Sequence, residues 1–144
     1  MLLAKPSMRG MTLIELVMVL AIAAILLGIT YPLYVEQTTR ARRAEAMAAL
    51  QQIALAQERY YAVHQQYTSE LGVLTLDTAV QTGFSPRGYY QLSIATSDDQ
   101  QTFIATATAA SVQTQDVACQ QFWLNQLGQR GAIDQGGVAS LSCW

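Results

Sequence analysis

The sequence predicts an α+β protein in which one long N-terminal helix, transmembrane in its first half, packs against a small antiparallel β-sheet. Three observations predict this fold. Between Met11 and Val35 the only charged side chain is Glu15. Residues 36–64 contain neither glycine nor proline. Beyond residue 88, short segments alternate between apolar and polar residues and are separated by turn-forming residues.

The composition excludes several classes of protein. Of the 144 residues, 51% are hydrophobic and 12% are charged, whereas charged residues make up about 25% of a typical soluble domain. An ordinary soluble globule over the full length and a disordered chain are both excluded. The formal charge of −2 and the pI near 5.2 argue against a general nucleic-acid binder. The length allows one small domain beside a membrane-spanning element.

The N-terminal segment predicts a membrane-spanning helix behind a short leader. Residues 1–10 are weakly basic, with Lys5 and Arg9, and an apolar run follows from Met11 to Tyr31. A helix of about 20 residues crosses the hydrocarbon core of a bilayer, so this run is long enough. It is too long for the apolar core of a cleavable secretory signal, which has about 7–15 residues.

Glu15 is unusual in such a helix. A carboxylate at membrane depth costs about 2.5–3.5 kcal/mol, and such residues are mostly functional. Alternatively, Glu15 lies close enough to the helix start to reach the interface, where the helix dipole favours a negative charge. The residues alone leave both interpretations open.

The helix is predicted to continue to His64 with an amphipathic second half. Residues 36–64 are rich in Ala, Gln, Glu and Arg, which favour helix. Apolar residues recur about every 3.6 positions, which gives this half one apolar face that needs a domain packed on it. These residues are Met47, Leu50, Ile53, Ala54, Tyr60 and Tyr61.

Residues 65–144 are predicted to form that domain as an antiparallel sheet. The expected strands are Tyr89–Thr96, Thr102–Ala109, Gln121–Asn125 and a short one at Ala132–Asp134. The first strand places Tyr90, Leu92 and Ile94 on one face. The second places Phe103, Ala105, Ala107 and Ala109 on one face. Ser97-Asp98-Asp99-Gln100 is predicted as the turn between them.

Cys119 and Cys143 are the only cysteines. A disulfide is the simplest interpretation, and it implies an oxidising compartment; two unpaired buried thiols are the alternative. In the chain-entropy model the bond is worth roughly 3 kcal/mol.

Gly10-Met11-Thr12-Leu13-Ile14-Glu15, followed by the apolar helix, resembles the class III signal of type IV pilins and pseudopilins. The resemblance implies that a prepilin peptidase cuts between Gly10 and Met11 and methylates the new amine of Met11. It also implies that Glu15 is the assembly residue, pairing with the amine of a neighbouring subunit, and that Pro32 bends the helix.

Three further segments resemble the PilE-type minor pilins of Gram-negative bacteria. They are Arg42-Arg43-Ala44-Glu45-Ala46, Glu58-Arg59-Tyr60-Tyr61 and the ending from Cys119 to Cys143-Trp144. The resemblance implies a pilin fold with a C-terminal disulfide loop. It divides the chain into a leader (1–10), a transmembrane and assembly helix (11–35), an amphipathic half (36–64) and a head (65–144).

The resemblance also implies a function and a location. The chain is expected to be a minor pilin, held in the inner membrane with its N-terminus in the cytoplasm and then polymerised into a surface pilus for adhesion or twitching motility. The expected partners are other pilin subunits, the prepilin peptidase, the inner-membrane assembly machinery and, before assembly, membrane lipid. Arg40, Arg42 and Arg43 are expected to meet lipid headgroups or solvent, or acids of neighbouring subunits.

Two alternative functions share this architecture: a pseudopilin of a type II secretion system and a DNA-uptake receptor pilin. A receptor needs a basic stripe, but beyond residue 60 Arg87 and Arg130 stand against six acids, so nucleic acid is not expected as a partner. His64 has no second ligand at metal-binding spacing, and no nucleophile has an evident base. Neither a catalytic residue, a metal nor a cofactor is therefore expected, and the protein is predicted not to be an enzyme.

Overall fold

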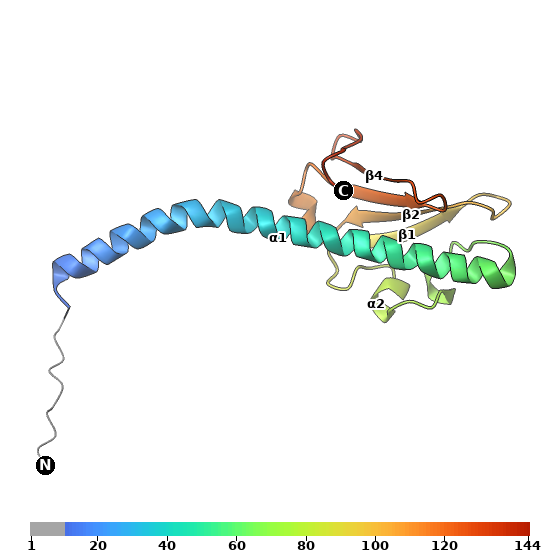
Figure 1. The fold of residues 1–144 in the computed structure, drawn as a ribbon, viewed down its shortest axis with the longest axis horizontal. Helices are drawn as coiled ribbons and strands as arrows, with labels where there is room; N and C mark the ends of the chain where they lie inside the picture. Colours follow the sequence, from blue (N-terminus) through green and yellow to red (C-terminus); the bar gives the residue numbers. More distant parts are fainter. Residues whose placement is uncertain (1–10) are drawn as a thin grey trace, which may run out of the picture. The chain divides into compact units, whose positions relative to one another are not determined.

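The computed structural model describes residues 11–144, so the predicted leader and Gly10 lie outside the described residues. The chain divides into two compact units, the first ending at Gln37 and the second running from Thr38 to Trp144. Helix α1 (Leu13–His64) begins in the first unit and ends in the second, which confirms the long helix (Figure 1).

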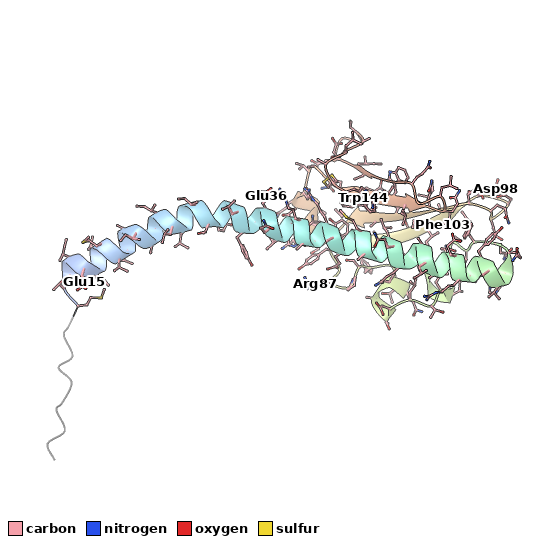
Figure 2. All side chains as sticks on the ribbon, in the orientation of Figure 1. Glu15, Glu36, Arg87, Asp98, Phe103 and Trp144 are labelled. Atoms are coloured by element: carbon pink, nitrogen blue, oxygen red, sulfur yellow. A yellow bond between two sulfur atoms is a disulfide. The ribbon has the colours of Figure 1, made fainter. Side chains whose placement is uncertain are left out.

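The described part of the first unit is a bare apolar helix. Of the side chains described between Met11 and Gln37, Ala23 is half-buried and the others are exposed. Large apolar residues dominate, with exposed fractions between 45% for Val35 and 81% for Leu13. Glu15 lies in the first turn (Figure 2). Residues 11–37 have no core of their own, so their apolar surface requires lipid or other helices around it.

The second unit is a four-stranded antiparallel sheet beside the second half of α1. The strands follow one another in space as in sequence and are β1 (Tyr90–Thr96), β2 (Phe103–Ala109), β3 (Gln121–Asn125) and β4 (Arg130–Ile133). They run along one side of the cyan-to-green part of α1, and the short helix α2 (Thr78–Gln81) lies on the other side (Figure 1).

The core lies between α1 and the inner face of the sheet. From the helix it takes Ala46, Ala49, Leu50 and Ile53, spaced three and four residues apart as one helical stripe requires. From the strands it takes the predicted faces, Tyr90, Leu92 and Ile94 of β1 and Phe103, Ala105 and Ala107 of β2. Both predicted strand faces are confirmed, with Ala109 half-buried at the end of its strand.

The fourth strand differs from the prediction of Ala132–Asp134. It begins earlier, at Arg130, and it ends at Ile133 because the Asp134 carboxylate turns the chain. The Oδ1 atom of Asp134 accepts hydrogen bonds from the backbone N–H groups of Gly136 and Val138, both at 2.9 Å. An aspartate whose side chain accepts hydrogen bonds from backbone N–H groups that follow it stabilises a turn and does not continue the strand.

The turn between β1 and β2 is as predicted. The Asp99 carboxylate accepts hydrogen bonds from the Ser97 hydroxyl at 2.5 Å and from the Gln101 N–H at 3.2 Å. The Ser97 bond is the main cause of a lowered pKa for Asp99. Asp99 is therefore a structural turn residue, and Asp98 precedes it in the same turn.

Two side chains near the end of α1 fix the chain that leaves it. Gln57 is fully buried; its amide donates to the Thr68 carbonyl at 2.5 Å and accepts from the Thr68 N–H at 3.1 Å. The Tyr67 hydroxyl donates to Glu58 at 3.0 Å. Burial and this contact raise the pKa of Tyr67 to about 12. The segment after the helix is thus tied back onto it.

Candidate functional site

The start of α1 forms a capping box. The Thr12 hydroxyl accepts a hydrogen bond from the Glu15 N–H at 3.4 Å, and the Glu15 carboxylate accepts one from the Thr12 N–H at 3.5 Å. This reciprocal pair, three residues apart, satisfies two N–H groups that a helix start leaves unpaired. Both distances are at the long limit of a hydrogen bond.

The carboxylate lies at the end of a helix that is able to span a membrane. An 18-residue window of α1 has a mean hydropathy of 2.7, and none of it is buried. Each large apolar side chain moved out of water gains about 1.5–3 kcal/mol, so the surface strongly favours a dry environment. In that environment Glu15 is the one formal charge among the described residues 11–35.

Pro32 lies within α1, whose helical backbone continues through that position. Proline has no N–H, so the Gly28 carbonyl loses its partner one turn earlier. The Thr30 hydroxyl donates a hydrogen bond to the carbonyl of Leu26, one turn before it, at 2.6 Å. The bend at Pro32 stays a prediction.

Arg43 was expected to meet lipid headgroups, solvent or acids of neighbouring subunits, but it pairs with an acid of its own chain. Its guanidinium donates two hydrogen bonds, both of 2.7 Å, to the two carboxylate oxygens of Asp116. Gln113 donates a third bond to that carboxylate at 2.9 Å. The side chain of Asp116 is 5% exposed and that of Arg43 19%. This bidentate pair joins α1 to the segment after β2, so Arg43 serves the fold of its own subunit.

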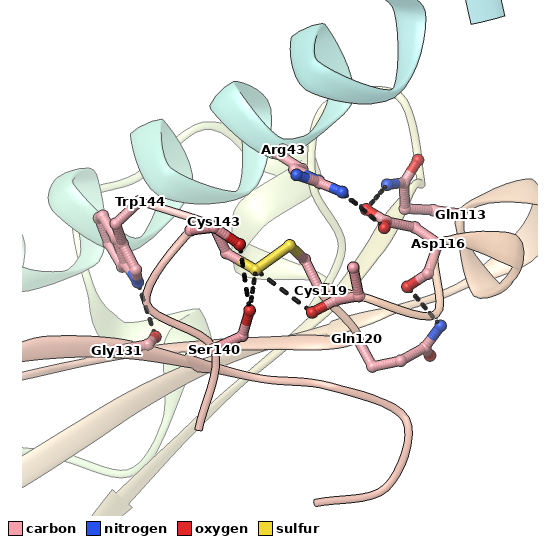
Figure 3. The surroundings of a disulfide bond; sticks show 11 residues. Arg43, Gln113, Asp116, Cys119, Gln120, Gly131, Ser140, Cys143 and Trp144 are labelled. Carbon is pink, nitrogen blue, oxygen red and sulfur yellow. Dashed lines mark hydrogen bonds and ion pairs between the residues drawn. A yellow bond between two sulfur atoms is a disulfide. The ribbon is translucent and has the colours of Figure 1, made fainter. Parts of the chain in front are cut away.

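The disulfide between Cys119 and Cys143 is confirmed. Figure 3 shows it beside the Arg43–Asp116 pair, with the Ser140 hydroxyl 3.1 Å from the Cys143 sulfur. The two cysteines are 24 positions apart in the sequence, and the segment between them contains β3 and β4. The indole N–H of Trp144 donates to the Gly131 carbonyl at 2.7 Å, so the chain end is fixed to β4 as well.

Most cations of the second unit lie beside intramolecular partners. The guanidinium of Arg42 lies 4.8 Å from the centre of the Tyr89 ring, and that of Arg130 lies 5.0 Å from the Trp144 ring. Arg87 lies 3.9 Å from the carboxylate of Glu45. Arg42 and Arg130 thus pack on aromatic rings, and Arg87 lies beside an acid.

The described residues offer no metal centre. Among residues 11–144, no three His, Cys, Asp or Glu side chains gather in a group that could hold an ion. His64 is exposed at the end of α1, where its ring stacks on Tyr60 with 4.0 Å between the ring centres.

Sequence reasoning missed Thr12, Gln57 and Asp116. The capping pattern of Thr12 and Glu15 is visible in the sequence as Thr-x-x-Glu at the start of an apolar run. Gln57 and Asp116 carried no such pattern, because their roles depend on burial that only the packed head creates.

Two family models match the chain. Residues 32–123 match the model described as "Type IV minor pilin ComP, DNA uptake sequence receptor". Residues 5–31 match the prokaryotic N-terminal methylation motif. Together they cover the leader motif and the two helix segments that resemble pilins, whereas most of the ending from Cys119 to Trp144 lies beyond them.

Two known proteins are similar over much of the chain. The type IV major pilin protein PilA of Myxococcus xanthus (strain DK1622) is 30% identical over 134 residues, which are 90% of this chain and 56% of that protein. The chain thus spans little more than half the length of this relative. A solved type IV pilin from Shewanella oneidensis has 25% identity and a TM-score of 0.51, over 74% of this chain and 97% of that one.

Proposed function

Because the chain belongs to the type IV minor pilin family, we propose that it is a structural subunit of a type IV pilus that polymerises through α1. A prepilin peptidase would cut between Gly10 and Met11 and methylate the Met11 amine, as the methylation motif suggests. The assembled fibre would support adhesion or twitching motility. Type IV pilins are structural proteins, and we expect neither enzymatic activity nor a cofactor.

The observation that carries the proposal is one carboxylate at the start of an exposed apolar helix segment. Buried among lipid or sister helices, Glu15 needs a cation. The free amine of a neighbouring Met11 is suitable. At about 4 Å and an effective dielectric constant near 20, the attraction is about 4 kcal/mol before desolvation is subtracted. Such a pair forms at one stagger of two helices, which makes Glu15 a register residue.

Before assembly, we propose that the subunit is a single-pass protein of the inner membrane with a cytoplasmic N-terminus. The hydropathy of α1 supports the anchor, and the disulfide supports a head in an oxidising compartment. Its partners would be lipid, the prepilin peptidase, the inner-membrane assembly machinery and other pilin subunits.

The experiment compares Glu15→Ala with Thr12→Ala in cells. Both changes break the capping box, but only the first removes the charge. We expect equal amounts of both variants in the membrane fraction. Thr12→Ala should enter sheared fibres and Glu15→Ala should be lost from them. Wild-type amounts of Glu15→Ala in the fibres would refute the role of Glu15.

Binding of DNA is a second candidate function, because the matching family model is described as a DNA uptake sequence receptor. The contacts of the head do not favour it: Arg43 is paired with Asp116, and Arg87 lies beside Glu45. Phosphate recognition needs several accessible cations. We expect the full chain in detergent to give no mobility shift with duplex DNA at physiological salt. A shift at micromolar protein would favour the receptor function.

A further inference from the structure

The outer face of the sheet, turned away from the core, carries neutral hydrogen-bonding side chains around one tryptophan. Since Leu92, Ala107 and Phe122 are buried, the residues on either side of each along its strand point outward. The neutral polar side chains at these positions, which we call the outer face together with Trp123, are Gln91, Ser93, Thr106, Thr108 and Gln121. All of them are exposed or half-buried.

Strand register places Trp123 in one row with two hydroxyls. Trp123 pairs with Thr106 on β2, and Thr106 pairs with Ser93 on β1. Neighbouring strands are about 4.8 Å apart, so both hydroxyls lie within about 10 Å of the indole. The next row contains Gln91, Thr108 and Gln121.

Gly131 on β4 lets the indole lie across the neighbouring strand. A Cβ atom on this glycine would lie 2.7 Å from Nε1, Cε2 and Cζ2 of Trp123, too close for any side chain. Gly131 has no positive φ angle, so glycine is needed here for space and not for backbone conformation. The ring is held against the sheet, and its remaining exposed surface is turned outward.

The polar groups around the ring keep hydrogen-bonding capacity for a ligand. The Gln121 amide donates to the Thr108 hydroxyl at 3.2 Å, which leaves the Gln121 carbonyl oxygen and the Thr108 O–H available. The side chains of Gln91, Ser93 and Thr106 make no hydrogen bond within residues 11–144. Asn125 is different, because its amide already bonds to Gln129 and Leu127 in the next turn.

The charge of the face restricts its partner. None of the outer-face residues is ionisable, and Arg130 pairs with inward-facing Leu124, with its guanidinium near Trp144. A polyanion such as DNA binds when cationic side chains displace its counterions, and the outer face has no such side chain. A stable protein interface would need a larger apolar centre than Trp123 and its neighbour Ile104 provide. A neutral, polar ligand with one apolar face matches best.

We propose that the outer face binds a neutral carbohydrate, with one sugar ring packed on the Trp123 indole. A pyranose ring has an apolar C–H face for the aromatic ring and a rim of hydroxyls for Thr106, Ser93 and Gln121. The proposal goes beyond polymerisation and does not depend on it, because the face belongs to the unassembled chain.

The test uses the full chain in lauryldimethylamine oxide, a detergent without a sugar headgroup. The probe is an array of immobilised neutral oligosaccharides of glucose, galactose, mannose and N-acetylglucosamine, with sialylated and sulfated glycans and duplex DNA alongside. We expect binding to neutral glycans, weakened about tenfold or more by Trp123→Ala, as for a central aromatic contact. Thr106→Val should weaken it several-fold and keep the strand intact.

Trp144→Phe is the matched control. Trp123 and Trp144 are the only tryptophans, so this variant should keep its affinity and report sugar binding through the fluorescence of Trp123 alone. No retention of any neutral glycan by the wild type would overturn the proposal. Binding of Trp123→Ala and Thr106→Val at the wild-type affinity, or a preference of the wild type for acidic glycans or DNA, would overturn it too. Neither result bears on the proposal that the chain polymerises, because fibre assembly is measured separately.

Discussion

Replacing Asp116 by alanine should destabilise the second unit far more than loss of a surface ion pair would. The change removes the bidentate partner of Arg43, whose side chain is 19% exposed, and it removes the acceptor of Gln113. Removing one partner of a buried pair costs about 3–5 kcal/mol. Since Arg43 retains some contact with water, we expect a loss of about 3 kcal/mol, at the lower end of that range.

The assay is urea unfolding of the full chain in detergent, followed by tryptophan fluorescence. The double variant Arg43→Met, Asp116→Leu removes both charges and should recover most of the lost free energy of unfolding, because no buried charge remains unpaired. Arg87→Ala is the matched surface control: Arg87 is 73% exposed and 3.9 Å from Glu45, so its loss should cost less than about 1 kcal/mol. Equal costs for Asp116→Ala and Arg87→Ala would refute the reasoning.

Three further measurements test the head. Replacing Cys119 and Cys143 by serine should lower the free energy of unfolding by about 3 kcal/mol. A reductant should lower the free energy of unfolding of the wild type by a similar amount. Gln57→Leu should cost about 1–3 kcal/mol in urea unfolding, because both backbone groups of Thr68 lose their partner. Because the pKa of Tyr67 is raised from 10.0 to about 12, the folded state keeps this proton longer than the unfolded chain. The stability of the wild type should therefore fall relative to Tyr67→Phe between those pH values.

Local patterns in the sequence were sufficient to predict the helix and the strand faces. The helix needed only the absence of glycine and proline from residues 36–64 and the apolar run before them. The alternation of Tyr90, Leu92 and Ile94 predicted their burial, because side chains of a strand alternate between two faces. The disulfide followed from there being only two cysteines.

Contacts between distant segments could not be predicted in this way. Asp116 lies 73 residues from Arg43, and the run of three arginines gave no reason to single out one of them. Gln57 looks like an ordinary helix residue until Thr68 folds back over it. The start of β4 depends on its pairing with β3, which no local pattern predicts.

The most direct test of the assembly proposal is mass spectrometry of the N-terminal peptide of the chain recovered from sheared surface fibres. We predict a peptide that begins at N-methylated Met11, because the amine that pairs with Glu15 exists only after the bond to Gly10 is cut. Fibres in which the chain still begins at Met1 would contradict the proposal, since the leader would then occupy the place of that amine.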